Sequence, residues 1–170
     1  MPSLPLIVAR SRFASMIVLI VAKYGIWCMA LGVAVVGLRQ GSANFLFLVL
    51  SSTITAIATQ QVIGIMWFRE RPFVQLRDWP NLVGVHPSTK SFPSDHAAAA
   101  FALAITTVLH HQPFAAFWVG VAGLIAFSRH LAGVHYISDI LVGAAIGTLF
   151  ALLIPTFFNP IWPHLFTPLF

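Results

Sequence analysis

Residues that could carry out chemistry form three short polar groups in an otherwise apolar chain. The groups read Arg71-Pro72, then Pro93-Ser94-Asp95-His96, and then Ser128-Arg129 followed by His135 and Asp139. Only 8% of the residues are charged, and ionisable side chains within a membrane are costly, so such a cluster indicates a functional site. These residue types suit one task, in which cations hold a phosphate while a histidine attacks it.

His135 and Asp139 are four residues apart, so on a helix their side chains would share a face and could touch. A carboxylate bonded to one imidazole nitrogen would fix the tautomer and leave the other nitrogen free to attack. The alternative is a buried polar pair that only ties this helix to its neighbours. The pair alone does not distinguish the two interpretations.

The second group is typical of a helix start, because serine is a favoured N-cap. Backbone N–H groups of a first turn bind anions, and His96 there could donate a proton to a leaving oxygen. Arg71 and Arg129 carry planar guanidinium groups suited to phosphate oxygens. Taken singly, Ser94 could be only a helix cap and each arginine only an interfacial residue.

The composition predicts an integral membrane protein. Hydrophobic residues make up 59% of the 170 residues, against about 45–50% in soluble proteins. The net charge of +5 comes from scattered bases rather than a run, which favours anionic lipid or phosphate over nucleic acid as a partner. The single cysteine, Cys28, excludes an internal disulfide. The first apolar segment is too long for a signal-peptide core, so we expect it to be retained.

The apolar segments predict an all-α, polytopic bundle in one domain, residues 1–170, with about five transmembrane helices. A spanning helix needs about 20 mostly apolar residues. The candidate segments are 13–38, 43–68, 94–111, 113–128 and 136–154. Residues 69–93 form the one long loop, Pro155 is expected to stop the fifth helix, and the tail after it is expected to lie at the interface.

Helix direction brings the three polar groups together. The second and fourth helices end just before Arg71 and at Arg129, and the third and fifth begin at Ser94 and near His135. Helices that alternate in direction would place all four points on the same membrane face. We therefore expect one site at one membrane interface.

The three groups resemble the signature of the phosphatidic acid phosphatase type 2 superfamily, K-x6-R-P, P-S-G-H and S-R-x5-H-x3-D, over residues 64–139. The resemblance implies that His135 is a nucleophile forming a phosphohistidine, that Asp139 orients it, and that His96 is the general acid. It further implies that Arg71, Ser94 and Arg129, with backbone N–H groups near Asp95, hold the phosphate. No metal or cofactor is implied.

Two positions depart from this signature. Gly64 stands where the family has lysine, and the replacement cation is predicted to be Arg69 first, Lys90 second and Lys23 a distant third. The alternative for Arg69 is a pair with Glu70 or a lipid headgroup. Asp95 stands where the family usually has glycine, a variant that resembles undecaprenyl diphosphate phosphatases of the bacitracin-resistance type. Asp95 could pair with Arg69 or tune His96.

The expected function is removal of the terminal phosphate of a lipid phosphate substrate, a polyprenyl (undecaprenyl) diphosphate. The alternatives are a phosphatidate or phosphatidylglycerophosphate phosphatase, and a catalytically weak relative that binds or transports phospholipid or phosphate. The resemblance implies a bacterial inner membrane and an extracytoplasmic site. Arg10 and Arg12 argue for the opposite orientation by the positive-inside rule. His110, His111 and His164 are expected on the far face and are not expected to bind metal.

Overall fold

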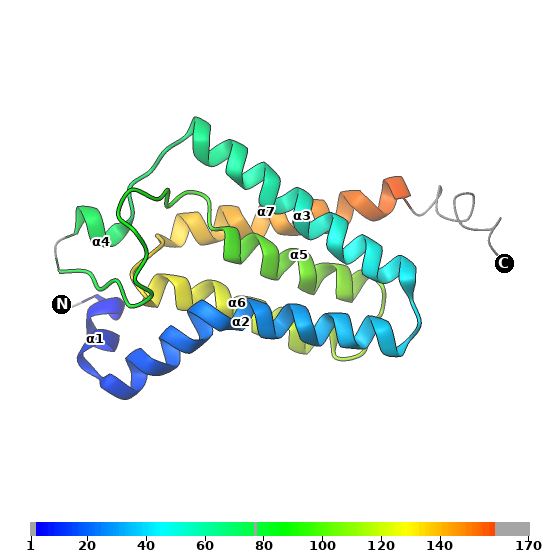
Figure 1. Cartoon of the computed structure of the whole chain (residues 1–170), viewed down its shortest axis with the longest axis horizontal. Helices are drawn as coiled ribbons and strands as arrows, with labels where there is room; N and C mark the ends of the chain where they lie inside the picture. Colours follow the sequence, from blue (N-terminus) through cyan, green and yellow to red (C-terminus); the bar gives the residue numbers. More distant parts are fainter. Residues whose placement is uncertain (1–2, 77, 159–170) are drawn as a thin grey trace.

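The computed structural model describes residues 3–76 and 78–158, and in this part of the chain it contains seven helices and no strand. Two helices are short, and the other five run roughly along the long axis of the molecule (Figure 1). Their bounds are α1 Leu4–Arg10, α2 Arg12–Arg39, α3 Ala43–Met66, α4 Pro72–Gln75, α5 Asp95–Leu109, α6 Ala115–Leu131 and α7 Ile137–Phe158.

Helix α5 is the centre of the bundle and contacts α2, α3, α6 and α7. Its buried residues are mostly alanines, which let neighbouring backbones approach closely. Helix α7 makes the closest approach through two glycines. A Cβ atom on Gly143 would lie 2.6 Å from the carbonyl oxygen of Ser94, and one on Gly147 would overlap the carbonyl oxygen of Ala98. The backbones of α5 and α7 are therefore in direct contact.

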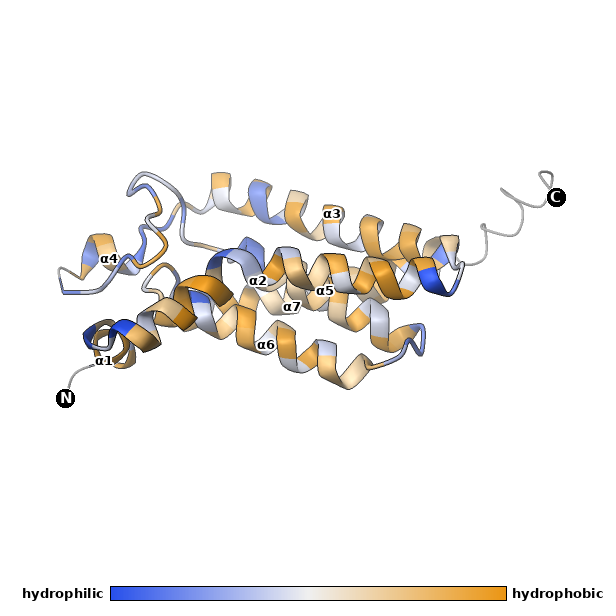
Figure 2. Ribbon diagram, turned by 60° about the horizontal axis from the view of Figure 1, so that its bottom comes forward, coloured by the Kyte–Doolittle hydropathy of each residue, from blue (hydrophilic) through white to orange (hydrophobic). Residues whose placement is uncertain are grey.

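The outer surface of the bundle is apolar along its length. Figure 2 shows hydrophobic residues over the long helices, with hydrophilic ones at the loop that carries α4 and at the turn between α2 and α3. Helices α2, α3 and α7 are long and apolar enough to cross a membrane. Helices α5 and α6, of 15 and 17 residues, are apolar but shorter.

The expected helices all occur, and their ends differ from the prediction by a few residues. Helix α1 was not expected. The prediction that Pro155 stops the last helix is wrong, because α7 continues to Phe158 with Pro155 buried inside it. A proline lacks only its own N–H group, so near a helix end it removes one backbone bond without ending the helix. The predicted interfacial tail lies mostly in residues 159–170, outside the described residues.

The turn after α6 directs the chain toward the centre of the site. Gly133 has a φ of +79°, a left-handed conformation that favours glycine. Its N–H group donates to the carbonyl of His130 at 2.8 Å, and the N–H group of Val134 donates to that of Arg129 at 3.2 Å. A Cβ atom at residue 133 would overlap the carbonyl oxygen of Pro80, so the long loop packs directly against this turn.

We predict that Gly147→Ala destabilises the bundle, since the added methyl group would overlap the α5 backbone, which cannot rotate away as a side chain could. The matched control is Gly120→Ala on α6, where the Cβ atom meets nothing within 4 Å. In a helix this change alone is worth about 1 kcal/mol in favour of alanine. Thermal unfolding in detergent should show a lower midpoint for Gly147→Ala only, and equal midpoints would contradict the close contact.

Candidate active site

The loop between α3 and α5 closes over one end of the bundle, where the ends of α3 and α6 meet the starts of α5 and α7 (Figure 1). The N–H group of Ser91 donates to the carbonyl of Arg69 at 2.8 Å, and that of Ser94 donates to the carbonyl of Asp139 at 3.1 Å. The N–H group of Leu82 donates to the carbonyl of Ala132 at 3.2 Å. Groups far apart in the sequence therefore lie together at this end.

Asp139 is the best-fixed residue of the site, with none of its surface exposed. One carboxylate oxygen accepts from the guanidinium of Arg69 at 2.8 Å. The other accepts from the hydroxyl of Ser91 at 2.6 Å and from the backbone N–H group of Tyr136 at 2.8 Å. Burying a carboxylate is unfavourable unless it is paired and hydrogen-bonded, and Asp139 is both.

His135 is oriented mainly by a backbone carbonyl, which corrects the expectation of a direct bond to Asp139. Its Nδ1 atom donates to the carbonyl of Ser91 at 2.7 Å, while the nearest Asp139 oxygen is 3.8 Å away. The reason is that His135 precedes α7, so the helical spacing of four residues does not apply. A carbonyl only accepts, so Nδ1 carries the proton and Nε2 presents a lone pair.

The ring of His135 is uncharged at neutral pH. Only 3% of its surface is exposed, and burial lowers its pKa to about 4 against a partial opposing effect of Asp139. The positive charges of Arg129 and Arg71 contribute to this lowering. Neutral Nε2 is the form that can act as a nucleophile.

Arg71 faces this lone pair. One of its terminal nitrogens lies 3.4 Å from Nε2 of His135 and donates to the carbonyl of Val134 at 2.9 Å. Its Nε atom donates to the hydroxyl of Thr89 at 2.9 Å. Burial lowers the pKa of Arg71, and the carboxylates of Asp95 and Asp139 act in the opposite direction. The guanidinium is thus held beside the nucleophile.

At the site itself, two predicted phosphate-binding residues have a buried polar atom without a hydrogen-bond partner among the described residues. Arg129 donates to the carbonyl of Ala22 at 2.7 Å, but its Nε atom has no acceptor. Ser94 occupies the predicted N-cap position of α5, yet its hydroxyl accepts no N–H group and is buried without a partner. Leaving such groups unpaired costs about 1–3 kcal/mol each. An anion bound here would satisfy both.

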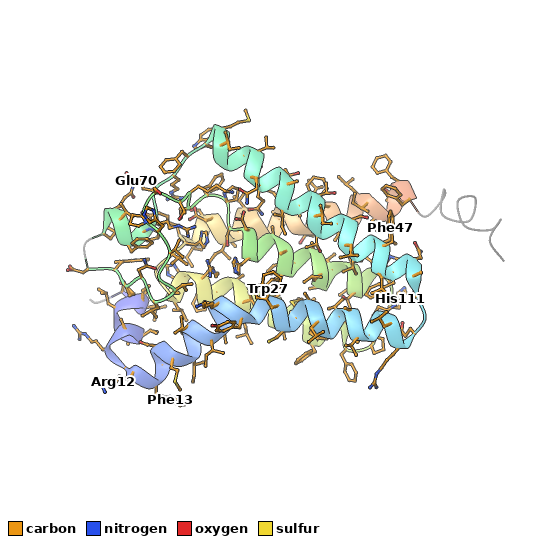
Figure 3. All side chains as sticks on the ribbon, viewed as in Figure 1. Arg12, Phe13, Trp27, Phe47, Glu70 and His111 are labelled. Carbon is orange, nitrogen blue, oxygen red and sulfur yellow. The ribbon has the colours of Figure 1, made fainter. Side chains whose placement is uncertain are left out.

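His96 lies on the first turn of α5 and connects the polar site with an apolar cavity. The cavity has a volume of about 260 Å³ and lies between α2, α3 and α5. Apart from Asp95, His96 and Thr53, its lining is apolar, and Trp27 at its edge is 72% exposed. Figure 3 shows Trp27 on α2, midway along the bundle.

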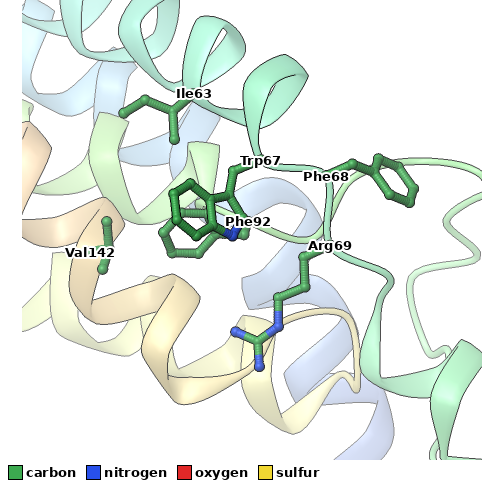
Figure 4. Close-up of a pocket in the computed structure, with 6 residues that line it drawn as sticks. All are labelled: Ile63, Trp67, Phe68, Arg69, Phe92 and Val142. Carbon is green, nitrogen blue, oxygen red and sulfur yellow. The ribbon is translucent and has the colours of Figure 1, made fainter.

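The structure places Arg69 at Asp139, a partner that the sequence analysis did not suggest. The guanidinium bonds Asp139 and the hydroxyl of Ser138, each at 2.8 Å, and stacks 3.9 Å from the centre of the Tyr136 ring. It does not pair with Asp95 or Glu70 in the structure. Figure 4 shows the guanidinium pointing toward the start of α7 from the edge of a cavity of about 600 Å³. Arg69 therefore positions Asp139.

Lys90, the second candidate cation, pairs with Asp95. Its ammonium donates to the carboxylate at 3.3 Å and to the carbonyl of Gln60 at 2.9 Å. The amide of Gln61 donates to the other oxygen of Asp95 at 3.2 Å. Lys23, the third candidate, is exposed and its ammonium lies 5.3 Å from the centre of its neighbour's ring, Tyr24.

Sequence reasoning missed Thr89, Ser91 and Tyr136. Ser91 accepts from His135 through its backbone carbonyl, and every residue type has such a carbonyl, so the sequence could not reveal this contact. The Ser91 hydroxyl is not part of any motif. Of the histidines expected on the far face, Figure 3 shows His111 at the end of the bundle opposite Glu70, and His164 lies outside the described residues. Among residues 3–76 and 78–158, no three histidine, cysteine, aspartate or glutamate residues gather as metal ligands.

Comparison with known proteins identifies the family of this chain. Residues 45–163 match the model of the PAP2 superfamily, and the chain belongs to this superfamily, as the motifs predicted. It is therefore an integral membrane protein of the PAP2 class.

Three similar proteins refine the comparison. The chain is 29% identical over 140 residues to the "Bacitracin transport permease protein BcrC" of Bacillus licheniformis, covering 81% of this chain and 68% of that protein. The crystal structure of Aquifex aeolicus LpxE has a TM-score of 0.66 and 24% identity, over 90% and 92% of the two chains. That of a PAP2 type phosphatidylglycerolphosphate phosphatase from Bacillus subtilis has a TM-score of 0.57 and 21% identity, over 92% and 82%. The two crystal structures share the fold.

We predict that His135 titrates near pH 4 in the substrate-free protein, well below the value of about 6.5 for an exposed histidine. NMR of ring-labelled histidine, assigned by loss of the signal in His135→Gln, would measure this. Because the folded state then binds fewer protons than the unfolded state, acid should destabilise the fold as the pH falls from about 6.5 toward 4. A midpoint near 6.5 would contradict the buried, neutral ring.

Proposed function

We propose that this protein is a lipid-phosphate phosphatase that works through a phosphohistidine at His135. The observation that carries this proposal is the buried, uncharged imidazole of His135. Its unprotonated Nε2 atom lies 3.4 Å from a terminal nitrogen of Arg71. Beside it, Arg129 and Ser94 have buried polar atoms with no partner in the described part of the chain. A nucleophile next to unpaired groups that can bind an anion suits attack on phosphorus.

The reaction would proceed in two steps. In the first, Nε2 of His135 forms a bond to the terminal phosphorus as its bond to the leaving-group oxygen breaks, which is the bridging oxygen in a diphosphate. His96, protonated in the complex with the anionic substrate, donates its proton to that oxygen. The ring gains a positive charge, which the carbonyl of Ser91 and the carboxylate of Asp139 stabilise. In the second, His96 accepts a proton from water, which displaces the phosphate from Nε2 and restores neutral His135.

Charge stabilisation in this mechanism comes from the protein alone, without a metal ion. Arg71 and Arg129 would hold the equatorial phosphoryl oxygens, and the first N–H groups of α5 add the positive end of the helix dipole. Asp139 would act indirectly, since it fixes Ser91 and through it the ring of His135. Arg69 would then be required for geometry rather than for phosphate contact.

We propose a polyprenyl (undecaprenyl) diphosphate as the substrate, with the terminal phosphate removed. Three observations support this choice: Asp95, the similarity to a protein named for bacitracin, and the apolar cavity that begins at His96 and could take a lipid chain. Phosphatidate or phosphatidylglycerophosphate is the alternative substrate, favoured by the Bacillus subtilis structure. Binding or transport without turnover is the alternative activity, and the word "transport" in the relative's name favours it.

We further propose that α5 and α6 also cross the bilayer, which gives five spans. Helix α5 is enclosed by other helices, so its 15 residues need not match the lipid thickness. Five spans would place the N-terminus on the membrane face that bears the site and the C-terminus on the opposite face. From the family resemblance we infer that this site faces outward from a bacterial inner membrane.

Purified protein should release inorganic phosphate from undecaprenyl diphosphate, and EDTA should leave the rate unchanged. His135→Gln should lower kcat by at least about 1,000-fold because it removes the nucleophile. His96→Ala should cost about 100- to 10,000-fold because the leaving oxygen loses its acid. The measurement is phosphate release in detergent, with phosphatidate and phosphatidylglycerophosphate assayed in parallel.

His111→Gln, at the far end of the bundle, is the matched control and should leave the rate unchanged. Full activity in His135→Gln would overturn the mechanism. Faster turnover of phosphatidate or phosphatidylglycerophosphate than of undecaprenyl diphosphate would show that the proposed substrate is wrong. No turnover of any of the three lipids would favour the binding or transport alternative.

A reporter fused to the C-terminus should give a cytoplasmic signal in a bacterial host if five helices span the membrane and the site faces outward. A periplasmic signal there would contradict that combination and would agree with the orientation that Arg10 and Arg12 favour. A second fusion at the exposed turn Gln40–Gly41 between α2 and α3 should report the same side as the C-terminus.

A further inference from the structure

The side chain of Lys90 occupies the space that a side chain at residue 64 would fill. A Cβ atom added to Gly64 would lie 2.7 Å from both Cε and Nζ of Lys90 and would overlap its Cδ atom. The lysine therefore reaches across α3 only because residue 64 is glycine. Its ammonium ends at the carbonyl of Gln60, one turn earlier on the same helix.

The ammonium is held in place and retains one free N–H group. Only 17% of the Lys90 side chain is exposed. Two donors are used, toward the carbonyl of Gln60 at 2.9 Å and Asp95 at 3.3 Å. An ammonium has three donors, so one N–H group has no acceptor among the described residues. This cation can bind an anion without giving up its present contacts.

The neighbours of Lys90 in sequence are both parts of the site. Thr89 accepts a hydrogen bond from Arg71, and Ser91 bonds both His135 and Asp139. Asp95, the partner of Lys90, is the carboxylate with the largest effect on the pKa of Arg71, which it raises against burial. Lys90 therefore lies beside the groups that would surround a bound phosphate.

We propose that Lys90 is a phosphate-binding residue, and that Gly64 and Asp95 serve to place it: the glycine leaves space for its side chain and the aspartate fixes its ammonium. The two departures from the family signature then form one arrangement, in which the cation comes from the loop before α5 instead of from α3. This inference rests on the proposed function and assigns the cation that the substrate phosphate meets.

The test compares Lys90→Ala and Gly64→Ala in the full-length protein. Lys90→Ala removes the cation, and Gly64→Ala displaces it, because the new methyl group meets only the flexible end of the lysine. Both should raise the inhibition constant of inorganic phosphate and lower kcat/KM by about 10- to 100-fold, as expected for a charge-assisted hydrogen bond. Gly123→Ala, whose Cβ atom meets nothing within 4 Å, is the matched control and should match wild type.

Double variants separate phosphate binding from a structural role. In Lys90→Ala protein, adding Gly64→Ala should cost nothing more, because the space beside residue 64 is already empty. The combination of Gly64→Lys and Lys90→Ala, which returns a lysine to the family position, should recover at least part of the lost phosphate inhibition. Thermal unfolding of each variant identifies any loss of folding. Changes in phosphate inhibition and kcat/KM are interpreted only for variants whose unfolding midpoint equals that of wild type.

Unchanged phosphate inhibition and kcat/KM in folded Lys90→Ala would overturn the inference. Independent, additive losses from Gly64→Ala and Lys90→Ala would also overturn it, since they would show that the glycine does not act through the lysine. If wild-type protein turns over none of the lipids, the proposed function fails separately. Stabilisation of wild type by added phosphate, lost in Lys90→Ala, would then still support the binding role.

Discussion

The buried carboxylate of Asp139 is the interaction on which the rest of this site depends. A charge with no exposed surface is tolerated only when its oxygens are fully bonded, and here the donors come from three different segments. Arg69 follows α3, Ser91 lies in the long loop, and Tyr136 precedes α7. The cost of leaving this charge unpaired therefore holds all three segments in one arrangement.

Close packing of α5 and α7 supplies the rigid part of the same arrangement. Glycines on α7 bring its backbone against α5, and the N–H group of Ser94 bonds the carbonyl of Asp139. The start of α5, which would bind phosphate, and the segment before α7 that carries His135 are therefore held rigidly together. The apolar cavity at His96 adjoins these segments on the side of α2 and α3, so a lipid chain could be accommodated there without disturbing them.

The sequence predicted what depends on length, residue type and spacing, and it missed what depends on the path of the loop. The lengths of the apolar segments predicted the long helices. The motifs predicted the residues that the structure brings together at one end of the bundle. The partner of Arg69 and the position of Lys90 over Gly64 could not be predicted, because each joins residues that are distant in the chain through contacts of the folded state. Pro155 was misjudged because the loss of one backbone bond near a helix end is small compared with continued burial.

The acceptor that sets the tautomer of His135 is a main-chain atom, and this affects how the protein can evolve. Any amino acid at residue 91 would still present the carbonyl to Nδ1, provided that the loop keeps its course. Substitution there would remove the hydroxyl bond to Asp139, and the bond from the N–H group of residue 91 to the carbonyl of Arg69 would then have to hold the loop in place. The orientation of the nucleophile thus depends on the path of the main chain at residue 91, which many residue types could follow if the loop stays anchored.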